Sequence, residues 1–313
     1  LIVPATSSTI SKMVSGNADN LLIATYMSIK CEVFFAPAMD LDMYKSPATK
    51  KNIETLVKNG HTLIKPGIGS LASGMSGEGR VEEPELILDF LKNHIKKKLI
   101  FRDKTFLITA GPTFEMIDPV RFIGNFSSGK MGYELAKEAS RLGAKVHLIS
   151  GPSNEQIDDE NITLKRIISA DEMFEECSKA FTDIDIFIMS AAVSDYKPSK
   201  RNHNKIKKDK SEKISVELIK NKDILKSLAS KKTKGQKVIG FSLETENELK
   251  NAIKKLKNKK LDAIILNSLN DEGAGFNLPT NKISFITSSY LKDFNVKTKK
   301  DVAKDILLEV FNL

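Results

Sequence analysis

The sequence predicts an α/β protein made of two doubly wound (Rossmann-like) three-layer domains, the first of them incomplete. Short apolar runs alternate with amphipathic helical patterns, which is typical of parallel sheets covered by helices. The length of 313 residues suits about two domains. Within residues 105–133, a polar Gly/Ser/Asn loop connects a strand pattern to a helix pattern, the usual place for phosphate binding in such folds.

The composition is that of a globular protein in a reducing compartment. No apolar run approaches the roughly 18 residues that a membrane span needs. The two cysteines, Cys31 and Cys177, provide neither a disulfide framework nor metal-ligand spacing. Both lie in apolar-periodic stretches and are expected to be buried thiols. We therefore expect a cytoplasmic location.

A net charge of +9 requires that nucleic acid and membrane be considered as partners. The lysine clusters are spread along the chain, without interleaved aromatic residues and without a known nucleic-acid motif. Solvated helix faces and a site for an anionic small molecule explain the charge equally well. We therefore expect neither nucleic acid nor membrane as a partner. The clusters lie at 92–98, 205–210, 231–237 and 254–260.

The first 100 residues read as alternating strands and helices. The opening LIVPAT resembles the end of a buried strand, so the chain is expected to lack an upstream part. A helix over 11–29 is predicted from apolar spacing at Leu21, Leu22, Ala24, Met27 and Ile29. The other expected elements are strands at 31–39 and 61–67, a helix at 46–60 with Ser46 as N-cap and Pro47 at its first position, a Gly/Ser-rich segment at 67–84 and a helix at 84–98.

Three loops of this part carry motifs, namely PATSST (4–9), APAMDLDMY (36–44) and LASGMSGEGR (71–80). Together they resemble the flavin-dependent decarboxylases that act on phosphopantothenoylcysteine. The resemblance implies FMN binding, a substrate site and a glycine-rich clamp that contains the proton donor. It assigns Thr6 and Ser7 to FMN, Asp40, Met43 and Arg80 to the substrate, and Ser73 to the catalytic position of the clamp. Read alone, the segment 67–80 is better interpreted as a flexible surface loop, and the other two motifs reverse that preference.

Two positions depart from the decarboxylase pattern. Asp40 replaces the asparagine that orients the substrate carboxylate, and an anionic side chain there repels a carboxylate unless it is protonated or bridged. Ser73 replaces the cysteine that donates a proton, and a hydroxyl is a far weaker acid than a thiol. The family's upstream phosphate loop and catalytic histidine are not found, and His61 is not that histidine. About half of a flavin site is therefore expected.

From residue 101 the pattern opens as strand–helix–strand–helix–strand, the mononucleotide-binding half of a doubly wound sheet. The glycines of the loop, at 111, 124, 129 and 132, do not form GxGxxG, and no acidic residue ends the strand 145–150. This argues against a dinucleotide-dependent dehydrogenase. The expected elements are strands at 105–109, 145–150, 185–191, 238–245 and 260–269, an edge strand at 281–287, helices at 130–142, 170–181, 246–259 and 297–311, and a strand–loop–helix at 213–229.

Two further stretches are suited to a nucleotide. Ser190, Ala191 and Ala192 are small residues at a strand end, where a flat base or a ribose can approach the backbone. Asp195 then stands where it can hold a divalent cation beside a triphosphate, although a small-residue turn with a solvated Asp is the alternative. The lysine cluster 204–210 suits a flap that closes over an anionic reaction centre, and a solvated charge run is its alternative.

Six blocks of this part resemble the phosphopantothenate–cysteine ligase family: DPVRFIGNFSSGKMG, AAVSDYKP, KIKKD, NKDIL, GFSLET and the NSL/GFN pair. The resemblance implies that Asn125 stabilises an acyl-cytidylate and that Lys205 is a flap lysine that neutralises charge as CTP is attacked. It implies that Asp195 binds the nucleotide or Mg²⁺. For Asp118 we expect only a structural role in a turn. The implied CTP contacts are Met189, Ser190, Ala191, Asp195, Lys205, Asn221, Lys222, Asp223, Ile224, Phe241, Lys255 and Lys259.

Both resemblances together point to the bifunctional coenzyme A biosynthesis proteins of bacteria, in which the decarboxylase (1–100 here) precedes the ligase (101–313 here). The expected substrates are 4′-phosphopantothenate, L-cysteine and CTP, with FMN and Mg²⁺ as cofactors. The expected assembly is a homo-oligomer with ligase dimers and a decarboxylase ring. A non-catalytic regulatory or binding homologue and a basic nucleic-acid binder are the alternatives.

Overall fold

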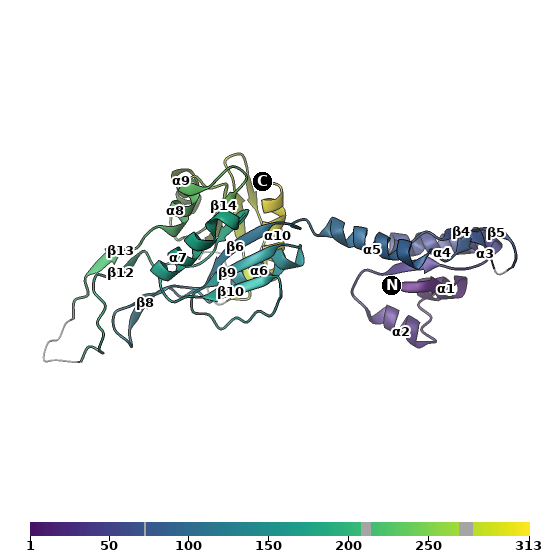
Figure 1. The fold of residues 1–313 in the computed structure, drawn as a ribbon, viewed down its shortest axis with the longest axis horizontal. Helices are drawn as coiled ribbons and strands as arrows, with labels where there is room; N and C mark the ends of the chain where they lie inside the picture. The colour runs from purple at the N-terminus through teal and green to yellow at the C-terminus, as the bar shows by residue number, and fades with distance from the viewer. Residues whose placement is uncertain (72, 208–213, 269–277) are drawn as a thin grey trace. The chain divides into compact units, whose positions relative to one another are not determined.

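The computed structural model describes residues 1–71, 73–207, 214–268 and 278–313. The chain folds as two compact units, Leu1–Lys97 and Lys98–Leu313, and Figure 1 labels many of their elements. Both units combine helices with mainly parallel sheets. In the described part of the chain, no helix is both long enough and apolar enough to cross a membrane.

Unit 1 is built on a small parallel sheet in the order β1-β2-β3. Ile10, Ile23, Phe35 and Leu56 are completely buried and form the centre of its core. Its strands are β1 (Ile2–Ala5), β2 (Phe34–Pro37), β3 (Thr62–Leu63), β4 (Gly67–Ser70) and β5 (Ser76–Arg80). Its helices are α1 (Ser7–Ser15), α2 (Leu21–Ser28), α3 (Leu41–Lys45), α4 (Pro47–Lys58) and α5 (Pro84–Lys98).

The single helix predicted over residues 11–29 is wrong. Gly16 takes a left-handed conformation with φ of 72° and ends α1, and Asn20 then caps α2 by accepting a hydrogen bond from the Ile23 backbone N–H at 3.0 Å. Within α2 only Ile23 is buried. The apolar residues on which the prediction rested are instead exposed, namely Leu21, Leu22, Ala24, Met27 and Ile29.

The Gly/Ser-rich segment forms a hairpin of β4 and β5 instead of an irregular loop. Its second strand lies against the loop that follows β2, where the Met39 backbone N–H donates to the Gly79 carbonyl at 2.9 Å. A Cβ at Gly79 would stand 2.3 Å from the Met39 carbonyl oxygen, so this close approach requires glycine. The hairpin is thereby attached to the motif that contains Asp40.

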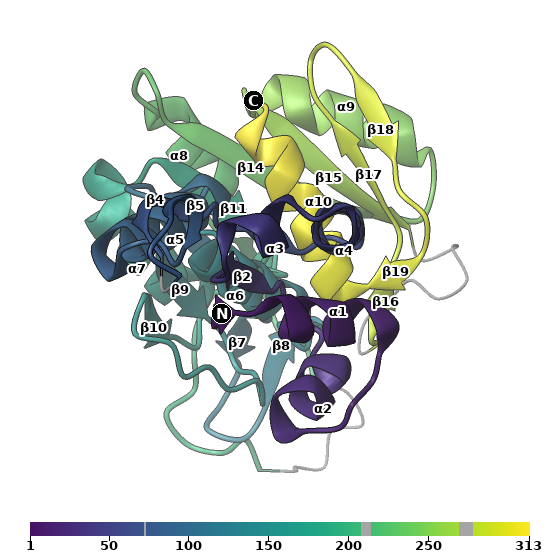
Figure 2. The ribbon, with the colours of Figure 1, turned by 90° about the vertical axis from the view of Figure 1, so that its right-hand side faces the viewer.

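Unit 2 contains an eight-stranded sheet in the order β10-β9-β6-β11-β14-β15-β17-β18. The first six strands are parallel to one another. The strand β17 pairs antiparallel with β15, and β18 pairs antiparallel with β17. Figure 2 shows β14, β15, β17 and β18 side by side. From β6 the chain first adds β9 and β10 on one side and then adds β11, β14 and β15 on the other side. The boundary between β6 and β11 is therefore the switch point, at which such sheets bind ligands. The strands are β6 (Thr105–Ala110), β9 (Lys145–Ser150), β10 (Ile162–Arg166), β11 (Ile186–Met189), β14 (Lys237–Glu244), β15 (Ala263–Ser268), β17 (Ile283–Ile286) and β18 (Leu291–Asp293).

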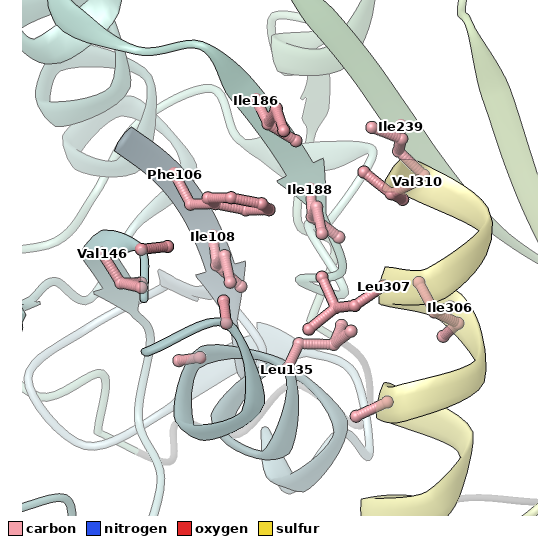
Figure 3. Close-up of a cluster of buried hydrophobic side chains, with 14 of the residues drawn as sticks. Phe106, Ile108, Leu135, Val146, Ile186, Ile188, Ile239, Ile306, Leu307 and Val310 are labelled. Atoms are coloured by element: carbon pink, nitrogen blue, oxygen red, sulfur yellow. The ribbon is translucent and has the colours of Figure 1, made fainter. Parts of the chain in front are cut away.

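Helices cover both faces of this sheet. One face carries α6 (Lys130–Arg141) and α10 (Lys299–Phe311), and Figure 3 shows Leu135 and Leu307 of these helices meeting Ile108 and Ile188 of the sheet. The other face carries α7 (Ala170–Ala180), α8 (Ile224–Lys231) and α9 (Glu248–Asn258). The smaller elements are β7 (Phe114–Met116), β8 (Phe122–Gly124), β12 (Tyr196–Pro198), β13 (Leu218–Lys220), β16 (Thr280–Asn281), β19 (Lys297–Thr298) and a 3₁₀ turn at Phe181–Asp183.

The predicted doubly wound α/β class is confirmed, and β9 coincides with the predicted strand 145–150. One placement is wrong, because β17 is not an edge strand: β18 pairs on its outer side. The hairpin of β7 and β8 and the strand β10 were not predicted. These segments are short and half-exposed, so they lack the continuous apolar run that marks a buried parallel strand.

The expectation of two buried thiols holds for Cys177 and is wrong for Cys31, which is exposed between α2 and β2. Burial in α7 raises the pKa of Cys177 to about 12, and only the thiolate is nucleophilic. We expect a thiol reagent at pH 8 to label one cysteine per native chain and two per denatured chain. Cys31→Ser should abolish native labelling and Cys177→Ser should leave it unchanged; rapid labelling of two native thiols would contradict the buried position.

Candidate active site

A cavity of about 430 Å³ opens at the carboxyl ends of β6 and β11, with β14 alongside. This is the switch point of the sheet, the position at which doubly wound sheets generally bind ligands. The cavity is lined by four stretches that are far apart in the sequence, together with residues from β6, β15, β16, α10 and the last turn and C-cap of α9. These stretches are 125–132, 189–195, 221–225 and 241–243, although Phe126 is not part of the lining.

The amino end of α6 forms one wall. Gly129 stands at the N-cap with φ of 83° and has no side chain to cap the helix. The first helical N–H, that of Lys130, makes only a long hydrogen bond of 3.5 Å to the Ser128 hydroxyl, so this helix amino end is suited to a ligand anion. A Cβ at Gly132 would lie 2.5 Å from the Ala110 Cβ and 2.8 Å from the Ser190 Oγ. The helix can therefore approach the sheet closely only because glycine occupies this position.

The loop after β11 is fixed onto β6. The Ser190 hydroxyl donates to the Thr109 carbonyl at 2.5 Å, and the Ala191 backbone N–H donates to the Thr109 hydroxyl at 3.2 Å. Asn125, just beyond β8, reaches the same loop, where its Nδ2 donates to the Ala192 carbonyl at 3.0 Å. Asn125 is therefore held at the strand end instead of being free to sample the loop.

The opposite wall is basic, and its lysines are positioned by carboxylates. Lys255 Nζ lies 2.5 Å from a Glu244 carboxylate oxygen and 3.1 Å from the Ser242 hydroxyl. Lys259 Nζ lies 2.8 Å from an Asp223 oxygen. Burial acts to raise the pKa of Glu244, but the hydrogen bonds from Lys255 and Ser242 outweigh it and leave the pKa below its usual value. Glu244 is therefore ionised at neutral pH.

Asn221 presents a polar atom without a partner. Its Nδ2 donates to the Ser194 carbonyl at 2.8 Å and its backbone N–H donates to the Asp195 carbonyl at 2.8 Å. Its Oδ1 is buried and accepts no hydrogen bond from the described residues. A buried acceptor left unsatisfied is costly, and a ligand N–H or O–H in the cavity would satisfy it.

The cavity gathers nearly all the residues that the sequence assigned to the second unit. These are Asn125, Met189, Ser190, Ala191, Asp195, Asn221, Lys222, Asp223, Ile224, Phe241, Lys255 and Lys259. Lys205 is the exception: it is exposed and does not line the cavity. Residues 208–210 of its cluster and the GFN block at 275–277 lie outside the described residues.

Sequence reasoning missed two lysines of the lining, Lys130 and Lys299. Both begin a helix, where a positive charge opposes the helix dipole, and this unfavourable placement was a usable signal. Lys299 is only 6% exposed. Burial lowers its pKa, the charge of Lys130 lowers it further and Glu155 acts in the opposite direction. Two lysines brought together at two helix amino ends make this wall suited to an anion.

The buried charge of Lys299 is expected to lower the stability of the folded protein and to favour the binding of an anion. Because its folded pKa is lowered, the unfolded chain binds more protons between that pKa and the ordinary value of 10.5. We expect Lys299→Met to raise the melting temperature at pH 7, by an amount that shrinks as the pH rises through this window, and to weaken pyrophosphate binding. Lys304→Met, on the same helix, is the control. Equal effects of both substitutions on pyrophosphate binding would contradict the role of Lys299.

In unit 1 the candidate residues gather around two loops. Thr6 caps α1 by accepting from the Thr9 N–H at 3.2 Å, and the Ser7 hydroxyl lies 3.2 Å from that of Thr49. Asp40 caps α3 through the Leu41 N–H at 2.6 Å, so one of its oxygens is already used.

The remaining candidates of unit 1 lie on or near the hairpin. Arg80 is paired with Glu83 at 2.8 Å, and Ser73 accepts a long hydrogen bond of 3.4 Å from the Met75 N–H. Met43 is half-exposed on α3. The contact of β5 with Met39 joins the hairpin to the loop of Asp40, so these two motifs are neighbours in space.

Asp195 is exposed at the rim of the cavity. Nowhere among residues 1–71, 73–207, 214–268 and 278–313 do three or more His, Cys, Asp or Glu residues form a group that could hold a metal ion. Mg²⁺ commonly binds through one or two carboxylates plus substrate phosphates, for which a single Asp at the rim is sufficient.

Comparison with known proteins adds to this geometry. Residues 101–313 match the family model of the DNA/pantothenate metabolism flavoprotein C-terminal domain, and residues 1–96 match the model named Flavoprotein. A cysteine/cysteine sulfinic acid decarboxylase from an unknown prokaryotic organism is 45% identical, over 100% of this chain and 88% of that protein.

The coenzyme A biosynthesis bifunctional protein CoaBC of Borreliella burgdorferi is 39% identical over 98% of this chain and 78% of its own length, and that of Bacillus subtilis is 40% identical over 99% and 77%. Among solved structures, the C-terminal domain of a CoaBC protein is 37% identical and covers 68% of this chain and 96% of its own, with a TM-score of 0.57.

Proposed function

The chain belongs to the DNA/pantothenate metabolism flavoproteins, the family that includes the CoaBC proteins, and from this premise we propose that unit 2 ligates 4′-phosphopantothenate with L-cysteine at the expense of CTP. The observation that supports this proposal best is the cavity at the switch point. It combines one helix amino end, five lysines and Asn125 within about 430 Å³. Two anionic substrates that must meet require such an excess of positive charge.

The reaction has two steps. A carboxylate oxygen of 4′-phosphopantothenate attacks the α-phosphorus of CTP, and the bond to the β-phosphate breaks to release pyrophosphate. The amine nitrogen of cysteine then attacks the acyl carbon of the acyl-cytidylate, and CMP leaves with the bonding electron pair. The amine loses a proton, and an amide results.

The geometry suggests how the substrates are divided between the walls. Lys255 and Lys259, held by Glu244 and Asp223, suit the nucleotide phosphates, and the Asn221 Oδ1 offers an acceptor to a nucleotide N–H or O–H. The opposite wall, with the open amino end of α6, suits the second anionic substrate. Asn125 lines the cavity and donates to the Ala192 carbonyl in the loop after β11, and we place the meeting point of the two substrates beside it.

Mg²⁺ fits this site as a metal carried by the nucleotide. Asp195 would supply one carboxylate, and the triphosphate would supply further oxygens. The ion would spread negative charge away from the phosphorus that is attacked. The protein's part is to place the carboxylate at the rim of the cavity.

For unit 1 we propose an FMN-dependent decarboxylation of the ligase product to 4′-phosphopantetheine. The first turn of α1, with Thr6 and Ser7, fits the phosphate end of FMN because its N–H groups are at a helix amino end. Bound FMN would supply a two-electron acceptor. Asp40 and Arg80 would contact the substrate, and Ser73, as a weak acid, would make any proton transfer from the hairpin slow.

The ligase proposal is tested by incubating the protein with CTP, 4′-phosphopantothenate and L-cysteine. We expect CMP and pyrophosphate in equal amounts, both dependent on all three substrates. Folded protein that forms neither would refute the proposal. The non-catalytic alternative is not favoured, because the similar full-length relatives are named as enzymes.

The relative named for cysteine decarboxylation favours one further candidate for unit 1, the decarboxylation of free cysteine or cysteine sulfinic acid. Release of CO₂ from these two amino acids, compared with release from the ligase product, separates the candidates. Release from the ligase product alone would support the coenzyme A route.

A further inference from the structure

Asp118 is a completely buried carboxylate in the turn between β7 and β8, and its two oxygens have different partners. Its Oδ1 accepts from the backbone N–H groups of Val120 at 2.8 Å and Arg121 at 2.9 Å, which closes the turn. Its Oδ2 accepts from the backbone N–H of Ile206 at 3.1 Å, 88 residues further along the chain. The turn role expected for Asp118 therefore describes only one of its oxygens.

Ile206 is held at its carbonyl group as well. The Arg121 guanidinium donates to the Ile206 carbonyl at 2.7 Å, and its Nε lies 3.5 Å from the Asp118 Oδ2. Nearby, the Asn202 backbone N–H donates to the Ile117 carbonyl at 2.9 Å. The segment 202–206 is thus attached to the hairpin of β7 and β8 at two places, and Lys205 immediately precedes the doubly held residue.

The same hairpin leads into the reaction centre. Asn125 directly follows β8 and donates to the Ala192 carbonyl at the wall of the cavity. One short hairpin therefore joins the candidate catalytic Asn125 at one end to the attachment of Ile206 at the other. Lys205 is exposed and lies outside the cavity lining, so the position of its backbone decides whether its charge can reach the reaction centre.

We propose that Asp118 is a positioning residue for Lys205: through its Oδ2 it anchors Ile206 and so places the flap lysine relative to Asn125. The proposal rests on the ligase function of unit 2. With Ile206 held, the backbone next to Lys205 has lost much of its conformational freedom before the substrates bind, so bringing the lysine to the reaction centre costs less entropy.

Asp118→Asn separates the two roles of this residue. The amide retains an oxygen that can accept from Val120 and Arg121, but it puts an NH₂ group toward the Ile206 N–H, which can no longer donate there. Asp159→Asn is the matched control, since Asp159 also accepts from a backbone N–H, that of Asn161, and does not line the cavity.

Two measurements test the anchor. Hydrogen exchange at the Ile206 amide should be slow in the wild type and at least about 10-fold faster in Asp118→Asn, while the amides of Val120 and Arg121 stay protected. For CMP formation, Asp118→Asn should lower kcat by about 10- to 100-fold, with little change in KM for cysteine, and should add nothing in a Lys205→Gln background.

The outcomes are distinguishable from failure of the ligase function itself. If the wild type forms no CMP, the exchange measurement still decides whether Asp118 holds Ile206. An Ile206 amide that exchanges at the rate of an unstructured chain in the wild type would overturn the anchor even if the variant failed to fold. Additive effects of Asp118→Asn and Lys205→Gln, or an equal loss in Asp159→Asn, would reduce Asp118 to a structural residue.

Discussion

Lys205→Gln is expected to lower kcat for CMP formation by about 100- to 1,000-fold and to leave the melting temperature unchanged. Lys205 is exposed, so its removal disturbs no packing. Its positive charge would be needed only while negative charge builds up on CTP, and an interaction made in the transition state acts on kcat. Steady-state rates with all three substrates, and thermal denaturation, provide the measurement.

Lys207→Gln is the control for this prediction, because Lys207 is exposed one residue beyond the anchored Ile206. Equal losses of kcat in both variants would indicate that the positive charge of this segment merely attracts CTP. Such an attraction would weaken as the salt concentration rises. A Lys205→Gln enzyme that turns over at the wild-type rate would remove Lys205 from the mechanism.

Asn125→Asp is expected to allow pyrophosphate release and to slow CMP formation by about 100-fold, so that acyl-cytidylate accumulates. The carboxylate cannot donate to the Ala192 carbonyl, to which Asn125 Nδ2 now donates at 3.0 Å, and it adds negative charge where an anionic intermediate is held. Acid quenching followed by chromatography would detect the intermediate as a burst of pyrophosphate without CMP.

Asn161→Asp, an exposed change of the same kind beside β10, is the control. Pyrophosphate and CMP that fall together in Asn125→Asp would place Asn125 in the first step instead of the second. An unchanged rate would exclude it from both.

The parts of the fold that could be predicted are those governed by burial. The strand β9 and the helix α6 were located within a residue or so, because a strand buried on both faces gives a continuous apolar run and a covering helix gives a regular stripe. The same reasoning gave a wrong result for α2, because most of its apolar residues are exposed and only Ile23 is buried in the core. Apolar spacing does not tell which face of a helix has a partner.

The candidate site divides in the same way. Loops that follow neighbouring parallel strands must meet at one edge of the sheet, so Ser190, which follows β11, could be grouped in advance with the loop after β6. Asn221 follows the antiparallel strand β13, and only the family resemblance assigned it to the site. Lys299 could not, because it reaches the cavity from the closing helix. The bond from Ile206 to Asp118 spans 88 residues, and no local pattern specifies such a contact.

The central claim is that a carboxylate of one substrate becomes joined to the α-phosphorus of CTP. The most direct test uses 4′-phosphopantothenate labelled with ¹⁸O in its carboxylate, incubated with CTP and L-cysteine and followed by mass spectrometry of the nucleotide product. The account predicts CMP that carries one ¹⁸O atom from each carboxylate consumed, with unlabelled pyrophosphate. Labelled orthophosphate together with CDP, or unlabelled CMP, would contradict it.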